Sequence, residues 1–385
     1  MHRKITLFIS AGEVSGDRHG AALVRELKAL DPTLNFIGMG SDAMASEGVR
    51  LLADLTPFST IGILEPLFYL PRIIKTYFKL KKSLSVEKPD GVVVIDYQGF
   101  HMLLLKAVKK LGIKSVYYIA PQEWQWGTEK GGQDVVSVVD KILAIFPKEA
   151  EFYTRLGGHV RFVGHPILDL AVNEMSRETF CRAYGLNPDR RIIAVFPGSR
   201  SQELIHTAPI LLEGAKALKT LYPDIQIVVS VASQMCKQRI LDRVAQFGLE
   251  GAAIVEGKSY ALMAHSDFSF CTSGTVTLEH AVLGTPCIVG YRFSAVSYAF
   301  LTTFFRKKIA HISYMSLPNI VANDLILPEF LQDQLTVEAL VRQATLWLEN
   351  VSQYRQTKEK LRHMTTLLGE RGVVKRAAVE IVKLF

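Results

Sequence analysis

An aspartate follows an apolar run in the first quarter of the chain. The stretch VVVIDYQGFH (92–101) places Asp96 directly after three valines and an isoleucine. A carboxylate at the carboxyl end of a buried strand can act as a general base, and partial burial raises its pKa toward neutral pH. The same position suits an aspartate that caps a helix or closes a turn, and Asp96 taken alone favours that simpler role. Two histidines, His19 and His101, are further candidate bases.

A turn of small residues in the second half of the chain is suited to binding an anion. PGSRSQELI (197–205) contains Gly198, Ser199 and Arg200, just before a segment with helical periodicity. The free N–H groups of a helix N-terminus and the forked donors of an arginine bind phosphate well. The alternative is that Arg200 pairs with a surface glutamate, either Glu203 or Glu213.

A second turn of the same kind begins the stretch TSGTVTLEHAVLGTP (272–286). Ser273, Gly274 and Thr275 open its helix, and Glu279 lies four residues beyond Thr275 on the same face. The Glu279 carboxylate could accept both hydroxyls of a ribose, whereas the alternative is a solvated glutamate behind an ordinary N-cap. Together the two turns predict a nucleoside diphosphate held by backbone amides and Arg200.

No Asp-x-Asp pair, which would suggest a divalent metal on the diphosphate, occurs in the sequence. We therefore expect neither a metal nor a cofactor. The charge of the leaving group would be met by Arg200 and by helix dipoles.

Two further segments of the first half have residue types suited to substrate contacts. SAGEVSGDRHG (10–20) follows the first apolar run, and its glycines recur every four residues, which matches neither the dinucleotide loop nor the phosphate loop. APQEWQWG (120–127) places Trp124 and Trp126 after another apolar run. Aromatic rings bind sugar rings well, and packing over a loop is an equal alternative.

A segment at residues 61–84 has apolar and basic residues on separate helical arcs. Its prolines place the start of any long helix near Pro71. A basic amphipathic helix beside apolar residues is typical of an anionic membrane surface, and the alternative is a core-facing helix with a solvated basic face. Residues 293–308 repeat the pattern and are too short to span a bilayer. The expected membrane contacts are Leu67, Phe68, Leu70, Arg72, Ile74, Lys75, Phe78 and Lys79.

The candidate site residues come from separate stretches of the sequence. They can lie close together only if the strands before them end at the same edge of a sheet. Apolar runs alternate with helical segments such as 206–222, and the runs are continuous, as in parallel strands that are covered on both faces. In such sheets, ligands bind beyond the carboxyl ends of the strands. The expected strands are 5–9, 92–96, 115–120, 141–146, 191–198, 225–231, 252–257, 267–272 and 286–291.

The sequence thus predicts an α/β fold with two Rossmann-like domains facing across a cleft. A length of 385 residues exceeds one ordinary core and also favours two domains. The stretch 164–180 reads as the linker, and the tail from about Thr336 reads as helical. We expect an N-terminal acceptor and membrane domain at 1–168, a donor domain at 169–345, and C-terminal helices at 346–385 that pack back on the first domain or on a partner subunit.

Composition indicates which kinds of molecule the protein is expected to bind and in which compartment. The net charge of +8 favours an anionic one, and the lack of a zinc-finger, RRM or KH pattern ranks nucleic acid lowest. The four cysteines form no C-x-x-C pair, which indicates neither a disulfide framework nor a zinc site and makes the cytoplasm the natural compartment. No apolar stretch is long enough to span a membrane, and the N-terminus lacks the features of a secretory signal.

Several of these stretches, in the same order, resemble those of bacterial lipid-A-disaccharide synthases. The resemblance implies a GT-B fold and an inverting glycosyltransferase of lipid A (lipopolysaccharide) biosynthesis. It rests on AGEVSGDRHGA (11–21), GMGSDAM (38–44), KPDGVVVID (88–96), APQEWQW (120–126), FVGHPILD (162–169), PGSRSQEL (197–204), TSGTVTLE (272–279), GYR (290–292) and SYMSLPN (313–319).

The substrates that the resemblance implies are UDP-2,3-diacylglucosamine as donor and 2,3-diacylglucosamine 1-phosphate as acceptor. The products would be the β-1,6-linked disaccharide 1-phosphate and UDP. The resemblance also implies a peripheral enzyme on the inner face of the cytoplasmic membrane, and a homodimer is one assembly that it allows.

Individual roles follow from the same resemblance. Asp96 matches the base, Arg200 the diphosphate ligand, Glu279 the ribose ligand and Asn319 a residue of the donor site. In a donor–acceptor cleft, the glycine loop would form the side opposite the UDP. Its backbone would come close to the sugar at Gly16, and the helix would start near Asp17. The acceptor or cleft side would comprise Glu13, Ser15, Gly16, Asp17 and Trp124.

Two positions depart from the family pattern. The family's IDAPDFN is IDYQGFH here, with Gly99 in place of a second acid, and its VWAWR ends in Gly127 in place of arginine. The roles of that acid and that arginine therefore do not carry over. Glu13, Asp17 and His19 are candidates to assist Asp96.

Other functions fit parts of the same pattern. A UDP-N-acetylglucosamine 2-epimerase or a muramyl-type transferase would keep the fold, but the membrane-like segments argue against the first and SLPN argues against the second. A non-enzymatic lipid-surface protein that binds a nucleotide accounts for the basic helices and leaves Asp96 unexplained.

Overall fold

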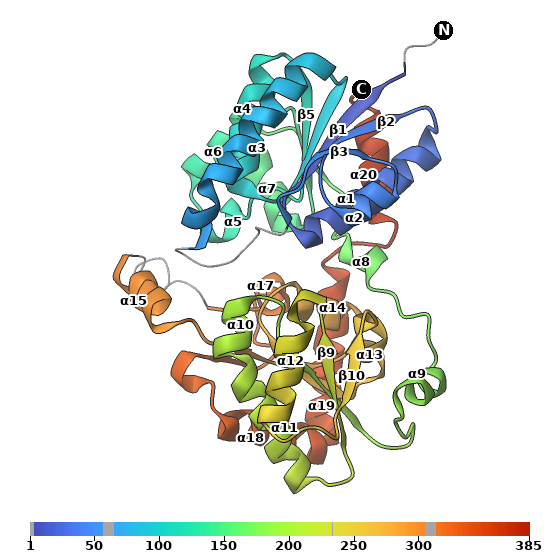
Figure 1. Ribbon diagram of the computed structural model, residues 1–385, viewed down its shortest axis with the longest axis vertical. Helices are drawn as coiled ribbons and strands as arrows, with labels where there is room; N and C mark the ends of the chain where they lie inside the picture. Colours follow the sequence, from blue (N-terminus) through green and yellow to red (C-terminus); the bar gives the residue numbers. More distant parts are fainter. Residues whose placement is uncertain (1–3, 57–64, 233, 305–312) are drawn as a thin grey trace. The chain divides into compact units, whose positions relative to one another are not determined.

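The computed structural model describes residues 4–56, 65–232, 234–304 and 313–385 (Figure 1). The chain divides into two compact units. Unit 1 comprises the chain up to Asp169 together with Leu368–Phe385, and unit 2 comprises Leu170–Leu367. Each unit contains one parallel sheet covered by helices, which confirms the α/β class and the two Rossmann-like sheets.

Unit 1 contains a seven-stranded sheet in the order β3-β2-β1-β4-β5-β6-β7, with every neighbouring pair parallel. The order reverses between β1 and β4, where Ala11 pairs with Ile95. This reversal is the position at which open α/β sheets bind ligands. The strands are β1 (Thr6–Ala11), β2 (Asn35–Met39), β3 (Arg50–Ala53), β4 (Gly91–Ile95), β5 (Lys114–Tyr118), β6 (Lys141–Ala144) and β7 (Val160–Phe162).

Helices cover this sheet, and one of them comes from the far end of the chain. The core includes Phe8, Val92, Val94, Leu104 and Tyr117, and the valines of β4 are buried on both faces, as its continuous apolar run requires. The helices are α1 (Val14–Leu30), α2 (Asp42–Ser46), α3 (Glu65–Glu87), α4 (Gln98–Lys110), α5 (Glu123–Trp126), α6 (Glu129–Val138), α7 (Pro147–Arg155), α20 (Val373–Val382) and, at the boundary of the unit, α8 (Ile167–Leu170).

Unit 2 repeats the pattern with a six-stranded parallel sheet in the order β10-β9-β8-β11-β12-β13. Here the order reverses between β8 and β11, where Phe196 pairs with Cys271. The two anion-binding turns predicted from the sequence follow these two strands. The strands are β8 (Ile192–Phe196), β9 (Gln226–Val231), β10 (Ala253–Glu256), β11 (Phe268–Thr272), β12 (Cys287–Tyr291) and β13 (Glu329–Leu331).

The core of unit 2 lies between this sheet and its helices, and includes Val195, Leu211, Val229, Phe270 and Ile288. The helices are α9 (Arg177–Tyr184), α10 (Ser201–His206), α11 (Ala208–Leu221), α12 (Gln234–Gln246), α13 (Ser259–His265), α14 (Thr275–Val282), α15 (Ala295–Phe304), α17 (Leu317–Ala322), α18 (Val337–Glu349) and α19 (Val351–Thr366), with a 3-10 turn η2 (Gln332–Gln334).

All nine expected strands are confirmed, and four further strands were missed: β2, β3, β7 and β13. These four have few consecutive apolar residues, and three of them lie at an edge of a sheet. Two of the predicted helix starts were wrong. α3 already includes Glu65 and contains Pro71 within it, and α1 begins at Val14 rather than near Asp17.

The last helix is held to unit 1 by a buried ion pair. α20 packs beside α1 (Figure 1), and Lys141 of β6 reaches it with Nζ 2.6 Å from Oε2 of Glu380. The hydrogen bond from Lys141, followed by one from the exposed Lys383, lowers the pKa of Glu380 to about 2. Because this pKa is lowered in the folded state, the pair stabilises the fold above the ordinary glutamate pKa and ceases to do so as the pH falls through about 2.

We predict that Glu380→Gln lowers the free energy of unfolding by about 1–3 kcal/mol at pH 7, because Lys141 loses its buried counter-charge. The matched control Lys383→Ala breaks only the exposed pair and should cost less than about 0.5 kcal/mol. Urea unfolding measures both, and the deficit of Glu380→Gln should shrink below about pH 4. Equal stability of the two variants at pH 7 would contradict the role of the pair.

Candidate active site

Asp96 lies at the reversal of strand order in unit 1, directly after β4. The backbone is left-handed at both Asp96 and Tyr97, with φ of 51° and 52°, an arrangement that costs energy for residues other than glycine. The Asp96 carbonyl accepts hydrogen bonds from His101 Nδ1 at 2.6 Å and from the Tyr117 hydroxyl at 3.0 Å. These two bonds hold the strained turn and fix where the Asp96 carboxylate lies.

The charge state of Asp96 suits a base. Burial raises the pKa of its carboxyl, while a hydrogen bond from the Tyr97 backbone opposes the shift. The carboxylate is only half-buried, so a ligand can approach it. Tyr97, and not Asp96, is the N-cap residue of α4, so Asp96 does not cap that helix, and its role as general base stays a prediction.

His101 and His19 are not suited to that task. Burial lowers the pKa of each imidazole to about 4. The neutral His101 ring uses both nitrogens, since Nδ1 bonds to Asp96 and Nε2 lies 2.8 Å from the Ser10 hydroxyl of β1. His101 thus positions the Asp96 turn and does not act as a reserve base.

The glycine loop after β1 packs directly on the Asp96 turn. A Cβ at Gly12 would come within 2.1 Å of the Tyr97 ring, and one at Gly16 within 3.3 Å of the Ala11 side chain. Glu13 and Ser15 are half-buried, and the charge of Glu13 helps to raise the pKa of Tyr97, second to burial. The loop and the proposed base therefore share one end of the sheet.

The expectation that Asp17 points at a substrate is wrong. Its side chain is buried and accepts hydrogen bonds from the backbone N–H groups of Ser41, Ala43 and Met44, at 2.7, 3.0 and 3.3 Å. All of these contacts anchor the N-terminus of α2. Asp17 therefore holds the GMGSDAM segment against the glycine loop.

Trp124 is half-buried and packs on a neighbouring ring, one of the two roles that the sequence left open. Its ring lies 5.7 Å from that of Phe146, which in turn lies 5.1 Å from His165. The side chain of Trp126 is outside the described residues.

Glu123, the residue before Trp124, was missed by the sequence analysis. Its Oε1 accepts from the Gln98 amide at 2.5 Å and its Oε2 from the Thr128 backbone at 3.0 Å. A Cβ at Gly127 would lie 1.7 Å from that Oε2, whereas a Cβ at Gly99 would meet none of the described residues within 4 Å. The two departures from the family pattern thus differ: Gly127 makes room for a carboxylate, and Gly99 leaves open space.

A second missed acid, Glu149, lies inside unit 1 at the start of α7. It is buried, and Oε2 accepts from the backbone of Ile145 at 2.8 Å and of Phe146 at 3.1 Å. Burial raises its pKa to about 8, and the negative charge of Asp96 contributes to the shift. The proline and the spacing of FPKE could have revealed a helix cap, but nothing in the sequence indicated its burial beside Asp96.

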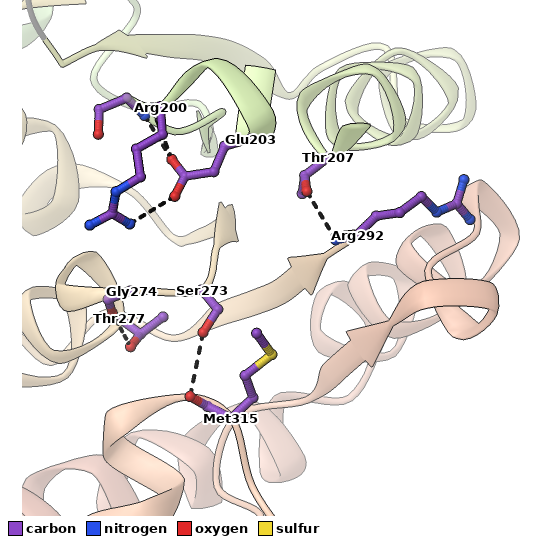
Figure 2. Close-up of polar contacts among 9 residues, drawn as sticks. Arg200, Glu203, Thr207, Ser273, Gly274, Thr277, Arg292 and Met315 are labelled. Atoms are coloured by element: carbon purple, nitrogen blue, oxygen red, sulfur yellow. Dashed lines mark hydrogen bonds and ion pairs between the residues drawn. The ribbon is translucent and has the colours of Figure 1, made fainter. Parts of the chain in front are cut away.

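In unit 2, Arg200 lies after β8 and Ser273–Thr275 after the neighbouring β11. Figure 2 shows Arg200, Ser273 and Gly274. Arg200 pairs with Glu203, one of the two glutamates in the simpler alternative, but Glu203 is buried and not at the surface: Nη1 lies 3.0 Å from Oε1. Glu203 also accepts from the backbone N–H groups of Ser199 at 2.9 Å and Arg200 at 3.2 Å. The expectation that these amides are free for a diphosphate is therefore wrong for this turn.

The turn after β11 keeps its expected form. Gly274 has a φ of 154°, and the Thr277 hydroxyl closes the first turn of α14 by donating to its carbonyl at 2.8 Å. Ser273 is buried, Thr275 is exposed, and Glu279 accepts from the Tyr260 hydroxyl at 3.3 Å.

Asn319 is fully buried and is used within its own loop. Its amide oxygen accepts from the backbone of Ile326 at 2.9 Å and of Leu327 at 2.8 Å, and its nitrogen donates to the Leu327 carbonyl and to Glu329. A direct contact with a donor would require these bonds to break. The structure instead makes Asn319 a support for residues 315–327.

Comparison with known proteins decides the family. The lipid-A-disaccharide synthetase family model matches residues 7–384. The chain belongs to the lipid-A-disaccharide synthase family. The synthase of Geobacter metallireducens is 36% identical over 378 residues, which cover 98% of this chain and 97% of that protein. The synthases of Syntrophus aciditrophicus (34% identical, 100% and 98% covered) and Gloeothece citriformis (35% identical, 98% and 99% covered) are similar over the same extent.

Membership in this synthase family confirms the resemblance and the expected glycosyltransferase class, and it does not favour the epimerase or the muramyl-type transferase. Solved structures agree on the fold alone. S. aureus MnaA bound to UDP superimposes with a TM-score of 0.67 at 16% identity, covering 100% of this chain and 98% of that one. The UDP-GlcNAc 2-epimerase of Neisseria meningitidis bound to UDP-GlcNAc gives 0.65 at 14% identity, covering 99% and 100%.

We predict that Glu149→Gln changes how stability depends on pH. Because the folded state raises the pKa of Glu149 to about 8, its contribution is fully present below the ordinary glutamate pKa and is lost as the pH rises through about 8. Between pH 4.5 and pH 8, the free energy of unfolding of the variant should therefore rise relative to that of the wild type by about 2–4 kcal/mol.

Urea unfolding across this pH range measures the gain. The matched control is Glu151→Gln, an exposed glutamate on the same helix, which should follow the wild type. Parallel curves for Glu149→Gln and the wild type would contradict the assignment.

Proposed function

We propose that the chain transfers 2,3-diacylglucosamine from UDP to the 6-hydroxyl of 2,3-diacylglucosamine 1-phosphate. The products are the β-1,6-linked disaccharide 1-phosphate and UDP. The observation that carries the proposal is the family match over residues 7–384. Its support within the chain is a half-buried Asp96 with a raised pKa at one strand reversal and Arg200 at the other.

In unit 1, Asp96 acts as the general base. Its carboxylate takes the proton from the acceptor's 6-hydroxyl while that oxygen forms a bond to the anomeric carbon, and the bond from this carbon to the UDP oxygen breaks. Attack from the face opposite UDP inverts the anomeric centre in one displacement. The left-handed turn held by His101 and Tyr117 keeps the carboxylate at the end of β4.

The acceptor side of the proposal uses the glycine loop. Glu13 is close enough to the Asp96 turn for its charge to act on Tyr97, and Ser15 follows in the same loop. Gly12 leaves room for the Tyr97 ring, and Gly16 for the Ala11 side chain. Asp17 acts indirectly, because it holds the N-terminus of α2 against the glycine loop. Trp124 contributes through its packing on Phe146.

In unit 2, Arg200 and the N-terminus of α14 at Ser273, Gly274 and Thr275 bind the diphosphate, and Glu279 binds the ribose. Gly198 and Ser199 shape the turn that carries Arg200. A cationic fork and the positive end of a helix stabilise the negative charge that develops on UDP as it leaves. The support is their common position at the β8–β11 reversal.

The lipid chains of both substrates call for a membrane surface, and α3 offers one. Leu70, Ile74 and Phe78 recur every four residues and are 45%, 46% and 60% exposed, with Arg72, Lys75 and Lys79 exposed beside them. On the adjacent arc of the same helix, Tyr77 packs on Phe100, and Leu80 and Leu84 are buried in the core. The side chains of Leu67 and Phe68 lie outside the described residues, as do residues 305–308 of the second basic segment.

Part of the apolar surface of α3 therefore packs on the core, as one interpretation of this segment required. The rest is exposed beside basic residues, as the membrane interpretation required. Among the described helices, none is long and apolar enough to cross a bilayer. We propose peripheral binding of α3 to the anionic inner face of the cytoplasmic membrane. A homodimer belongs to the same proposal, and light scattering of the detergent-solubilised protein measures it.

The activity is tested by incubating the protein with the acylated donor and acceptor in detergent. Mass spectrometry should find the disaccharide 1-phosphate, and UDP should appear only when the acceptor is present. A parallel reaction in EDTA should be equally active, because the proposal assigns the diphosphate charge to Arg200 and α14. Epimerised donor or acceptor-independent UDP release would overturn the transferase.

We predict that Asp96→Ala lowers turnover by at least about 100-fold and leaves UDP binding nearly unchanged, because only proton transfer is lost. The matched control is Asp134→Ala, an exposed aspartate on α6, which should behave as wild type. Because burial raises the pKa of Asp96, wild-type kcat/KM should fall on the acid side at a pH above the ordinary aspartate range. Near-normal turnover in Asp96→Ala would rule out the base.

We predict that the double variant Lys75→Glu/Lys79→Glu binds vesicles containing anionic lipid at least about tenfold more weakly, since each basic residue contributes about 1 kcal/mol at such a surface. Arg355→Glu, an exposed cation on α19, is the control. Vesicle sedimentation at low and high salt measures the difference. Unchanged binding by the double variant would place the membrane contact elsewhere.

A further inference from the structure

A buried glutamate lies directly beside the arginine assigned to the diphosphate. Glu203 is the third residue of α10, and its side chain is 3% exposed, whereas that of Arg200 is 35% exposed. Figure 2 shows the Glu203 carboxylate between the backbone of the turn and the guanidinium, which extends toward the turn at Ser273 and Gly274. The pair is therefore covered on the Glu203 side and accessible on the Arg200 side.

The two carboxylate oxygens of Glu203 have separate partners. Oε2 accepts from the backbone N–H groups of Ser199 and Arg200, and Oε1 accepts from Nη1 of Arg200 at 3.0 Å. Gly198 has a φ of 105°, and a Cβ there would lie 2.4 Å from Oε2. The glycine thus makes room for the carboxylate, and amides that suit an external anion already bind an internal one.

Within the described part of the chain, the neighbouring turn after β11 has no carboxylate against its glycine. A Cβ at Gly274 would meet no described atom within 4 Å. Behind the pair, Tyr291 at the end of β12 is close enough for the charges of both Glu203 and Arg200 to act on its phenol. The turn after β11 is therefore the more open of the two to a ligand. The turn after β8 instead offers the guanidinium of Arg200, which Glu203 holds by a hydrogen bond.

We propose that Glu203 is a positioning residue: its carboxylate occupies the amides of the turn and holds one guanidinium nitrogen, so the donor's diphosphate binds the remaining edge of Arg200 and not the amides of residues 199 and 200. This inference rests on the proposed function, from which it takes the diphosphate. A guanidinium has five N–H donors in one plane, and Glu203 uses a donor of Nη1 only. A side chain fixed in advance loses less entropy when the ligand binds.

The test separates the two tasks of the carboxylate. In Glu203→Gln, the amide oxygen can still accept from the two backbone N–H groups, but its NH2 group faces Arg200 and cannot hold it. We expect a melting temperature near that of the wild type, and a Kd for UDP raised about tenfold in calorimetry, the effect of one lost charge-assisted hydrogen bond. Arg200→Lys, which keeps the charge and leaves the turn intact, should weaken UDP binding to a similar degree.

A double-mutant cycle tests whether Glu203 acts through Arg200. In an Arg200→Ala background, Glu203→Gln should change the Kd for UDP by less than about twofold. An equal tenfold loss in that background would overturn the proposal, because the effect would then come from the turn itself. Wild-type or tighter binding by Glu203→Gln alone would also overturn it, since the carboxylate would then compete with the diphosphate.

Failure of this inference is distinguishable from failure of the proposed function. Disaccharide synthesis by the wild type, together with unchanged UDP binding and turnover in Glu203→Gln, would overturn only the role of Glu203. Absence of UDP binding to the wild type would overturn the donor site itself.

Discussion

The reversal of strand order within each parallel sheet is the constraint on which the rest of the molecule depends. Connections that leave two adjacent strands in opposite directions cover opposite faces of the sheet, because crossovers between parallel strands are right-handed. The loops between them diverge, and the strand ends stay accessible. In unit 1 this happens at β1 and β4, which brings the glycine loop to Asp96. In unit 2 it happens at β8 and β11, which brings Arg200 to Ser273–Thr275. Residues separated by about eighty positions in the sequence become neighbours for this reason alone.

Several loops at the carboxyl ends of the strands are held from within by the carboxyl groups of buried acidic residues. Asp17, Glu149 and Glu203 are each almost completely buried, and each accepts two or more backbone N–H groups. Glu329 does the same for residues 315 and 316. Such carboxylates replace the hydrogen bonds that irregular backbone would otherwise make with water. Asp96 differs because its backbone carbonyl accepts the two bonds that hold its turn, while its half-buried carboxyl accepts from the Tyr97 backbone.

Much of this arrangement could be predicted from the sequence. Buried parallel strands produce continuous apolar runs, so nine strands and the two turns of unit 2 were found from pattern alone, and β2, β3, β7 and β13 were missed because they are short or mixed in composition. The pattern could not show which way a carboxylate faces. Asp17 was expected to face a substrate and faces α2. FPKE could have revealed the helix cap at Glu149, but the proximity of Glu149 to Asp96, and of Glu123 to Gln98, joins separate segments and gave no signal. Asn319 illustrates the same limit: its motif indicated a ligand, and its four hydrogen bonds lie within its own loop.

The return of α20 to unit 1 has a consequence for how that unit holds together. Residues 170–367 form unit 2 without interruption, whereas unit 1 is assembled from two segments, the chain up to Asp169 and Leu368–Phe385. Val373, Val374, Ala377, Ala378 and Ile381 of α20 are buried, and the ion pair between Lys141 and Glu380 joins the two segments. Detachment of α20 would therefore expose apolar surface of the same unit that carries Asp96, so the two segments are expected to unfold together.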